Sequence, residues 1–540
     1  MLFRSLCKFI SKSEEKQDLE KLSFEYLESE QEADMKDLIK NFSDILDGRL
    51  GLVKSTKHRI DLLEGAKPVL LRPYRRSPTE RAAEAKCIKE MLEMGVIEPT
   101  SSPWGFPNVL IQKKDGRYRI TTNFKKLNAL TIKDAYPLPR IDDALDLLGG
   151  ANYFTVVDAN CGFFQVLLDE AAREKAVMTS FEGTYAYKRM PLGLINSPST
   201  FQRLMDIVLA GLKWKCCIVY MDDIIIFSKT FEDHIRDLRA VFSRLREAGL
   251  TLKLTKCSFA KDTLLYLGFI ISPNGIKPDP EKVKAVMDIM PPQNVHEVRS
   301  FLGMLGFFRM FIKDFAKLAR PLTELTKKGV KSVKASWSED HQHSFEMLKG
   351  RLSKAPILAF PNFKEHFYLE TDASNEQIGA VLMQKPEGKC RVIGYYSRKL
   401  NDAEVNYTTT EKECLAVVWA VTHKCRPYLH GQKFTVITDH AALRWLLNLD
   451  NPTGRLARWG LKLMEYDFEV ITRPGRLHSV PDALSRLPTK SEVVLAIKQM
   501  NPVIDRSGHE LPSLEEFKEA YSNDEFCNKL IQYFKNSREG

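Results

Sequence analysis

Two adjacent aspartates, Asp222 and Asp223, stand inside an apolar, β-branched stretch that runs from Val219 to Ser228. Valine, isoleucine and aromatic residues favour strands, and two such runs around a short polar pair are typical of a hairpin. The sequence therefore predicts two buried strands joined by a tight turn that carries both acids. The pair alone is also compatible with an ordinary solvated turn, because aspartate tolerates turn geometry.

A second β-rich stretch favours a chemical role for these acids over an ordinary solvated turn. Residues 153–157 read Tyr-Phe-Thr-Val-Val, and Asp158 follows them directly. Two strands that end in acids can build a site for hard divalent cations, which prefer carboxylate oxygens as ligands. Two such cations, about 3.5 to 4 Å apart, can hold the attacking and leaving oxygens of a phosphoryl transfer. Asp158, Asp222 and Asp223 can therefore build a metal site of the kind that nucleotidyl transfer needs.

The run Tyr220-Met221-Asp222-Asp223 resembles the catalytic box of reverse transcriptases, and Asp158 stands where their first catalytic aspartate precedes it. The similarity extends from about residue 45 to 487, with motifs in the family's order, and the pattern is that of gypsy-type LTR retrotransposon polyproteins. It implies an α+β and α/β multidomain fold, in which a right-hand polymerase of fingers, palm and helical thumb precedes a ribonuclease H-like domain.

The resemblance also implies an activity and its partners. An RNA-directed DNA polymerase that also copies DNA would take an RNA template, a DNA primer, deoxynucleoside triphosphates and RNA–DNA hybrids. Two Mg²⁺ ions per active site are expected, with Mn²⁺ as a substitute. Asp158 and Asp222 are expected to bind metal directly, and Asp223 to contribute more through charge and positioning.

Net charge is compatible with nucleic acid as a partner. The chain carries +10, and its first fifty residues hold 12 acidic and 8 basic side chains, so the remainder carries +14. Such a bias is not diagnostic, because many proteins without nucleic-acid partners reach it. Ten cysteines without a C-x-x-C pair indicate a reducing compartment rather than a zinc ribbon or a disulfide framework. No apolar run approaches a membrane span, so we expect no membrane partner and a cytoplasmic location, including virus-like particles.

A basic hairpin is predicted between Val109 and Ile120, where two strand-like runs flank an Asp-Gly turn. An ordinary solvated hairpin is one interpretation. In the resembled family this hairpin belongs to the fingers and binds the incoming triphosphate, which implies that role for Lys113 and Arg119.

Phe163 lies five residues after Asp158, where the resembled family places an aromatic ring beneath the sugar of the incoming nucleotide. The alternative is that Phe163 belongs to the core, as Phe164 does. If the strand continues past Asp158, the two rings point to opposite faces, and only one can exclude a ribose. We assign that role to Phe163.

Two further stretches resemble family motifs with substitutions. Residues 264–269 resemble the primer grip, which implies that Leu267 and Gly268 support the primer terminus, and Phe269 replaces the usual histidine. The signature that begins at Asn123 normally begins with aspartate. This substitution supports a competing interpretation, in which the chain is a catalytically inactive retroelement remnant that only binds nucleic acid.

A second set of acids follows in a different pattern. Residues 366–372 predict a strand that ends in an acid, and later residues predict strands at about 378–384 and 391–397, a helix at 409–425 and a strand at 434–438. This order is that of the ribonuclease H fold, and four acids fall where the fold places metal ligands: Asp372, Glu413, Asp439 and Asp482. Each acid alone could be a helix cap or a solvated residue, whereas together they can bind two metals.

The runs Thr371–Ser374 and Thr410–Glu413 resemble gypsy-type ribonuclease H motifs. The resemblance implies Mg²⁺-dependent endonuclease cleavage of the RNA strand in RNA–DNA hybrids. It gives the metal-binding role on the helix to Glu413, with Glu411 as its solvated neighbour.

These patterns predict five segments. An acidic arm at 1–50 is either a surface helix or flexible. The others are fingers and palm at 51–268, a helical thumb at 269–362, a ribonuclease H-like domain at 363–488, and a linker at 489–540 towards a missing integrase.

Overall fold

The computed structural model describes residue 24 and residues 26–112, 116, 118–330, 332–438 and 454–472. The chain forms one compact unit over Met1–Thr472, and the other unit, Arg473–Gly540, lies outside these residues. Within the described ranges, no helix is both long and apolar enough to cross a membrane. Seven of the described cysteines are free thiols.

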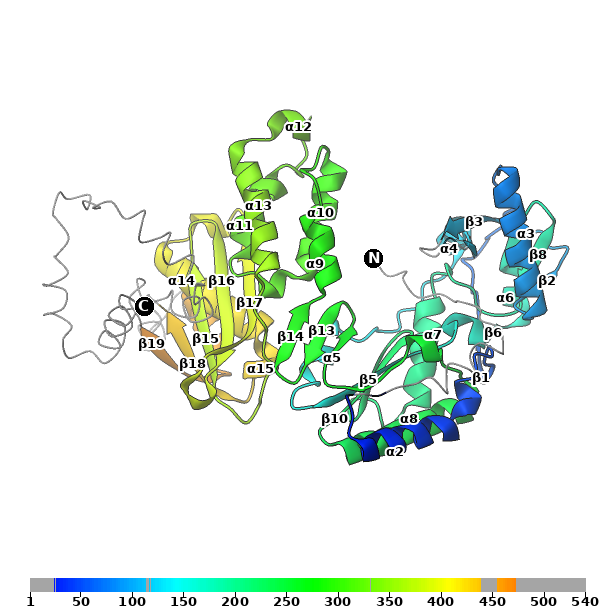
Figure 1. Ribbon diagram of the computed structural model, residues 1–540. Coiled ribbons are helices and arrows are strands. Elements are labelled where there is room, and N and C mark those ends of the chain that lie inside the picture. The colour runs from blue at the N-terminus through cyan, green and yellow to red at the C-terminus, as the bar shows by residue number, and fades with distance from the viewer. Residues whose placement is uncertain are drawn as a thin grey trace, which may run out of the picture. The chain divides into compact units, whose positions relative to one another are not determined.

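A four-stranded antiparallel sheet, here called the palm sheet, contains the predicted hairpin (Figure 1). Its strands follow the order β11-β5-β10-β9, and their bounds are Ser258–Lys261, Tyr153–Asp158, Asp223–Ser228 and Cys217–Tyr220. The apolar, β-branched residues of β10 are buried on both faces of the strand, as expected for a central position in the sheet. Helix α7 (Ser197–Val208) contacts β9, and helix α8 (Phe231–Glu247) contacts β10.

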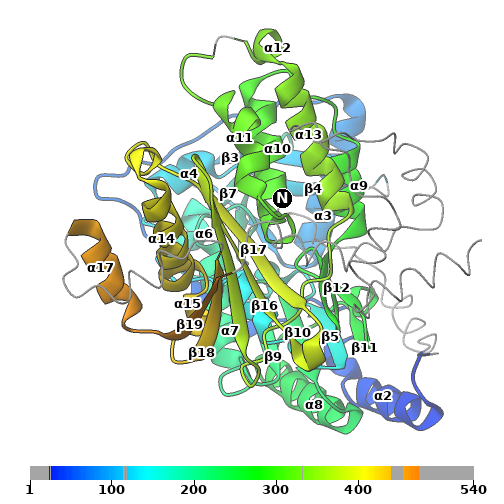
Figure 2. The same ribbon diagram turned by 90° about the vertical axis from the view of Figure 1, so that its left-hand side faces the viewer.

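The N-terminal acidic segment contains a packed helix, α2 (Ser29–Asn41), which lies along α8 (Figures 1 and 2). Leu38 is buried in this contact, and the Phe42 ring meets the Phe242 ring edge-on at 5.5 Å. Of the two interpretations of this segment, the structure therefore supports a surface helix for its described part.

A five-stranded sheet follows the order β2-β8-β7-β3-β4, with bounds Ile97–Pro99, Thr184–Tyr187, Val177–Thr179, Phe106–Gln112 and Tyr118–Thr122. Strands β3 and β4 form the predicted basic hairpin, paired from Asn108–Thr122 to Gln112–Tyr118. Helix α3 (Pro78–Glu93) contacts β4. The sequence alone favours a helix from Thr79 to Met94 with Thr79 as its cap. This prediction is wrong, because the N-cap is Ser77, in a capping box with Glu80.

The next segment combines a small three-stranded sheet with helices. Strands β12 (Leu264–Tyr266), β13 (Phe269–Ser272) and β14 (Gly275–Pro278) form the sheet. The helices are α9 (Pro280–Met287), α10 (Val295–Phe307), α11 (Phe315–Glu324), α12 (Val333–Ser336) and α13 (Glu339–Ser353). An aspartate before Pro280 and an asparagine three residues before Glu297 predict helix caps, and the structure confirms Asp279 and Asn294 as the caps of α9 and α10. Helix α9 ends at Met287, earlier than the Met290 that the following proline pair predicts.

The last described sheet follows the order β17-β16-β15-β18-β19, in which β15 pairs parallel with β18, and β18 with β19. Its strands are Arg391–Lys399, Gln377–Gln384, Phe367–Ala373, Lys433–Thr438 and Asp467–Thr472. Helix α14 (Thr409–Trp419) contacts β15 and β16 (Figure 2). The predicted single helix at 409–425 is wrong in its second half, because a π-helical segment, Ala420–Lys424, follows α14.

The remaining elements are short, apart from the ten-residue α17. They are η1 (Ser43–Ile45), β1 (Val53–His58), α4 (Lys125–Leu130), α5 (Ile141–Asp146), η2 (Gly162–Gln165), β6 (Val166–Leu168), α6 (Glu170–Lys175), η3 (Leu254–Lys256), η4 (Arg309–Phe311), η5 (Pro386–Gly388), η6 (Glu404–Asn406), α15 (Arg426–Leu429) and α17 (Gly454–Leu463).

Candidate active site

Strand pairing brings the three palm acids together. Asp223, the first residue of β10, lies directly opposite Asp158, the last residue of β5, in the antiparallel register. Asp222 belongs to the turn that joins β9 to β10, where Asp223 pairs with Tyr220. The predicted hairpin is confirmed, and the acids at its tip lie beside the end of β5, the strand that ends at Asp158.

Asp158 is buried and has a basic neighbour. The ammonium group of Lys256, in η3, lies 3.1 Å and 3.0 Å from the two carboxylate oxygens of Asp158. Because the two residues are 98 positions apart, no sequence spacing identifies Lys256 as part of the site. Its positive charge offsets part of the local negative charge.

The other two acids are destabilised as anions. Burial, followed by the charges of Asp158 and Asp223, raises the pKa of Asp222 to about 7. Burial, followed by the charge of Asp158, raises the pKa of Asp223 to about 6. Both causes disfavour the charged form, and a nearby cation would oppose them.

The turn itself is held by helix α7. Met221 has a φ of 53°, in the left-handed region that residues other than glycine rarely adopt. Its backbone N–H donates to Gln202 Oε1 at 2.9 Å, and Gln202 Nε2 donates to the Val219 carbonyl at 3.3 Å. Gln202 thus supports the turn through both groups of its side-chain amide.

Gly162 makes room for the acids. A Cβ atom at this position would lie 2.9 Å from Asp222 Oδ1 and 3.0 Å from Phe201 Cζ. Such distances are shorter than van der Waals contact, so any other residue would displace the Asp222 carboxylate or the Phe201 ring.

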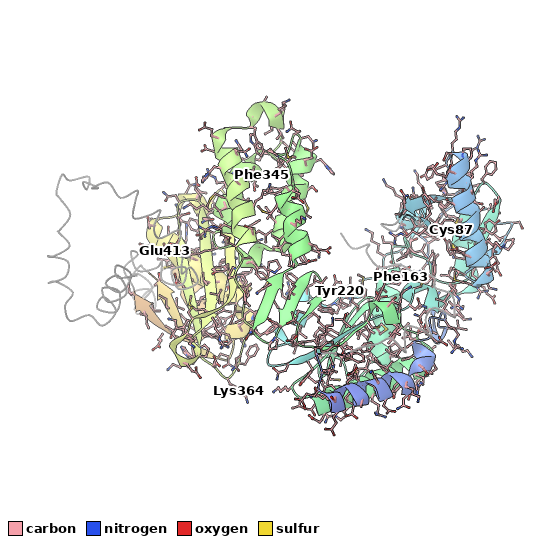
Figure 3. All side chains as sticks on the ribbon, in the orientation of Figure 1. Cys87, Phe163, Tyr220, Phe345, Lys364 and Glu413 are labelled. Carbon is pink, nitrogen blue, oxygen red and sulfur yellow. The ribbon has the colours of Figure 1, made fainter. Side chains whose placement is uncertain are left out.

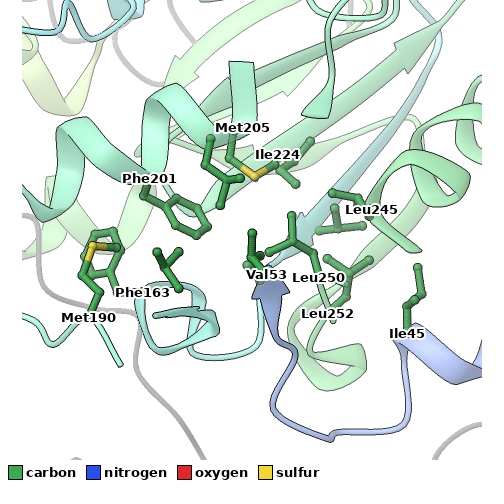
Figure 4. Packing of buried hydrophobic residues seen from close by; sticks show 14 of the residues in the cluster. Ile45, Val53, Phe163, Met190, Phe201, Met205, Ile224, Leu245, Leu250 and Leu252 are labelled. Atoms are coloured by element: carbon green, nitrogen blue, oxygen red, sulfur yellow. The ribbon is translucent and has the colours of Figure 1, made fainter. Parts of the chain in front are cut away.

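Phe163 and Phe164 lie in the 3₁₀ helix η2 rather than in a continued strand, so strand alternation does not apply to them. The Phe163 ring meets the Phe201 ring edge-on at 5.4 Å and is 9% exposed, in a hydrophobic cluster that also contains Met190 (Figure 4). The Phe164 ring, which is half-buried, stacks on Tyr187 with centroids 6.4 Å apart. The two rings therefore have different environments, and the more buried one is Phe163.

The palm acids suit a hard divalent cation. Among the described residues, no three His, Cys, Asp or Glu side chains already form a metal-binding group. However, all three donors here are carboxylates, and the buried Asp222 Oδ1 has no hydrogen-bond partner within the described structure. An unsatisfied buried carboxylate oxygen beside two further carboxylates fits the oxygen-ligand preference of Mg²⁺.

Of the two residues expected to bind the triphosphate, the structure describes one. Arg119 lies on β4 opposite Ile111, and its Nε atom is buried without a hydrogen-bond partner in the described ranges, whereas Lys113 lies outside them. Asn123 donates to the Tyr74 hydroxyl at 2.9 Å and accepts from the Lys125 N–H. The Asn123 side chain is thus satisfied locally.

The residues expected at the primer terminus form a tight turn between β12 and β13. Leu267 and Gly268 have φ values of 47° and 88°, as in the two-residue hairpin turn that matches strand twist. A Cβ atom at Gly268 would collide with Lys282 Nζ. Phe269, in place of a histidine, stacks on Phe307 at 5.0 Å and belongs to an aromatic cluster.

The second set of acids lies on the five-stranded sheet that α14 covers. Asp372 is near the end of β15, and Glu413, on α14, accepts a hydrogen bond from the Ala373 N–H at 3.1 Å. Figure 3 shows Glu413 on elements separate from those of Phe163 and Tyr220. Asp439 and Asp482 lie outside the described residues, and β18 ends at Thr438. Glu413 thus contacts the residue that follows Asp372.

Glu411 has a structural role rather than that of a merely solvated neighbour. Its side chain accepts from the Thr408 N–H at 2.9 Å and completes the capping box of α14. The carboxylate also lies 3.5 Å from Arg455 Nε.

Comparison with known proteins identifies two domains in the chain. Residues 111–271 match the family "Reverse transcriptase (RNA-dependent DNA polymerase)", and residues 362–466 match "RNase H-like domain found in reverse transcriptase". The Pol polyprotein of Drosophila melanogaster transposon 297 is 39% identical over 490 residues, covering 88% of this chain and 45% of the relative. That of transposon opus, also from Drosophila melanogaster, is 40% identical over 452 residues, covering 81% and 45%. The chain thus spans less than half the length of these relatives.

Solved structures show the same fold. A foamy viral protease-reverse transcriptase in complex with dsDNA has a TM-score of 0.72 at 21% identity, covering 87% of this chain and 98% of that one. The same viral protein in complex with an RNA/DNA hybrid has a TM-score of 0.70 at 20% identity, covering 94% and 67%. The chain therefore contains a reverse transcriptase domain followed by the RNase H-like domain found in reverse transcriptases, and most of its length is similar to Pol polyproteins of Drosophila transposons.

Proposed function

We propose that this chain is an RNA-directed DNA polymerase that also copies DNA and cleaves the RNA strand of RNA–DNA hybrids. The proposal rests on one observation: Asp158, Asp222 and Asp223 come together where the two central strands of the palm sheet, β5 and β10, meet the turn before β10. We assign polymerisation to residues 51–268 with a thumb at 269–362, and cleavage to residues 363–488. Its substrates would be an RNA template, a DNA primer and deoxynucleoside triphosphates, in the cytoplasm or in virus-like particles.

Asp158 and Asp222 would hold two Mg²⁺ ions, and Asp223 would add negative charge and position Asp158 across the strand pair. When bound, such ions activate the attacking hydroxyl and stabilise the leaving group of a nucleotidyl transfer. Gln202 keeps the turn in place, and Gly162 leaves the space that the Asp222 carboxylate occupies. Lys113 and Arg119 would bind the triphosphate, and Leu267 and Gly268 would support the primer terminus.

The ribonuclease site would use Asp372, Glu413, Asp439 and Asp482 as its metal ligands. The buried Glu413 carboxylate is oriented by the Ala373 N–H, so it faces the end of β15 that carries Asp372. Domains of both families generally depend on divalent metal ions.

Replacing Asp222 by Asn should lower the rate of primer extension at least about 100-fold, because the change removes a negative ligand from a hard-cation site. The free energy of unfolding without metal should be unchanged or higher, since one of three neighbouring negative charges is lost. Primer extension on an RNA template and denaturant unfolding should be measured on the same preparation. Extension at the wild-type rate would refute the assignment and favour the inactive-remnant alternative.

Replacing Glu413 by Gln should abolish cleavage of the RNA strand in a hybrid and leave extension on a DNA template within about twofold of wild type. The reason is that α14 packs in a hydrophobic cluster distinct from the two that include palm-sheet residues. The matched control is Glu411→Gln, which disturbs the cap of the same helix and should retain most of the cleavage. A parallel loss of extension and cleavage in Glu413→Gln would contradict two separate sites.

We propose that Phe163 excludes ribonucleotides because its ring occupies the space that a 2′-hydroxyl needs. Phe163→Val should raise incorporation of ribonucleotides relative to deoxynucleotides. Phe164→Val removes a half-buried ring that stacks on Tyr187, so it should lower stability and leave the sugar preference unchanged. Both incorporation efficiencies should be measured for each variant on one template. The assignment fails if the sugar preference of Phe163→Val equals that of the wild type.

A further inference from the structure

The amide of Gln202 can hold the catalytic turn in only one of its two orientations. As described above, its Oε1 atom accepts from the Met221 N–H and its Nε2 atom donates to the Val219 carbonyl. A flipped amide would set NH₂ against N–H and oxygen against carbonyl oxygen, so both hydrogen bonds would become repulsions. The turn therefore depends on whatever fixes this amide.

Asp206 lies one helical turn after Gln202 on α7 and fixes that orientation. Its Oδ1 atom accepts a hydrogen bond from Gln202 Nε2 at 2.9 Å. A carboxylate can only accept, so an Asp206 side chain in this place admits the NH₂ of the amide and rejects its oxygen. Asp206 thus selects the orientation in which Gln202 Oε1 faces the turn.

Two further residues keep the Asp206 carboxylate in place. The Tyr136 hydroxyl donates to Asp206 Oδ2 at 2.7 Å, and the Lys213 ammonium pairs with Asp206 Oδ1. Tyr136 belongs to the segment between α4 and α5, and Lys213 follows α7. Side chains from three parts of the chain therefore converge on one carboxylate that itself does not belong to the catalytic acids.

The turn requires such support because of its backbone conformation. Met221 occupies the left-handed region without being glycine, and its neighbour Asp222 carries the carboxylate whose place depends on the turn. Relaxation of Met221 would move Asp222 relative to Asp158, and displacements of about 1 Å can reduce catalytic rates about 100-fold.

We propose that Asp206 is a positioning residue of the polymerase site. Anchored by Tyr136 and Lys213, it fixes the amide of Gln202 and, through it, the backbone of the turn that carries Asp222. The inference rests on the proposed polymerase function of the same site.

Single-turnover primer extension tests the role with Asp206→Leu, which keeps the approximate side-chain size and removes the acceptor. The maximal rate should fall about 10- to 100-fold, while the Kd for template–primer stays within about twofold of wild type. The matched control is Asp134→Asn, because Asp134 pairs at 2.8 Å with Arg203, the neighbour of Gln202 on α7, and asparagine keeps an oxygen that can accept from the Tyr136 N–H as Asp134 does. This control should keep the maximal rate within about twofold.

A second readout is independent of activity. Hydrogen exchange of the Met221 amide, measured without nucleic acid or metal, should accelerate at least about tenfold in Asp206→Leu and stay unchanged in Asp134→Asn. The double variant Gln202→Leu/Asp206→Leu should extend primers as slowly as Gln202→Leu alone, because Asp206 acts through Gln202. Asp206→Asn, which keeps size and one acceptor oxygen, should show a smaller loss and serves if the leucine variant does not fold.

The proposal is overturned by a maximal rate of the Asp206 variants within about twofold of wild type, by additive losses in the double variant, or by unchanged Met221 exchange. A wild-type chain that extends no primer, together with accelerated exchange in Asp206→Leu, would overturn the polymerase function and leave the support of the turn by Asp206 standing.

Discussion

Three neighbouring carboxylates repel one another at the end of the palm sheet, and the surrounding structure must hold them in place against this repulsion. The register sets Asp223 opposite Asp158, and the adjoining turn adds Asp222. Because burial and neighbouring charges raise the pKa of Asp222 to about 7, the folded chain binds a proton there more tightly than the unfolded chain does. The metal-free fold is therefore stabilised by this group at low pH and loses that contribution as the pH rises from the ordinary aspartate value towards 7. A divalent cation would reverse that loss.

The surrounding structure holds these charges in place by several independent means. Strand β10 pairs with β5 along its whole length, and Ile224 to Ile226 are fully buried. Lys256 supplies a positive charge beside Asp158, Gly162 leaves room for Asp222, and Gln202 with Asp206 holds the turn. The buried acids thus lower the stability of the fold locally, and packing of the apolar core offsets this loss. This is the usual relation between a functional site and its fold.

Features set by local chemistry could be predicted from the sequence. The strands around Asp222, the caps Asp279 and Asn294, and the chain order of strands and helix between residues 366 and 438 follow from periodicity and turn residues. Features that depend on distant contacts could not. Lys256 lies 98 residues from Asp158 and Tyr136 lies 70 from Asp206, so no spacing connects either pair. The 3₁₀ turn after Asp158 likewise breaks the strand alternation on which the comparison of Phe163 with Phe164 depended.

The central claim is that the palm acids form a metal site for nucleotidyl transfer. Crystals of the chain with a template–primer, a matching deoxynucleotide and Mn²⁺ would test it most directly, because anomalous scattering locates the metal. The account predicts two Mn²⁺ peaks bridged by the carboxylates of Asp158 and Asp222, about 3.5 to 4 Å apart, with Lys256 moved away from Asp158. A complex with bound nucleic acid and nucleotide, but without metal at these carboxylates, would contradict it.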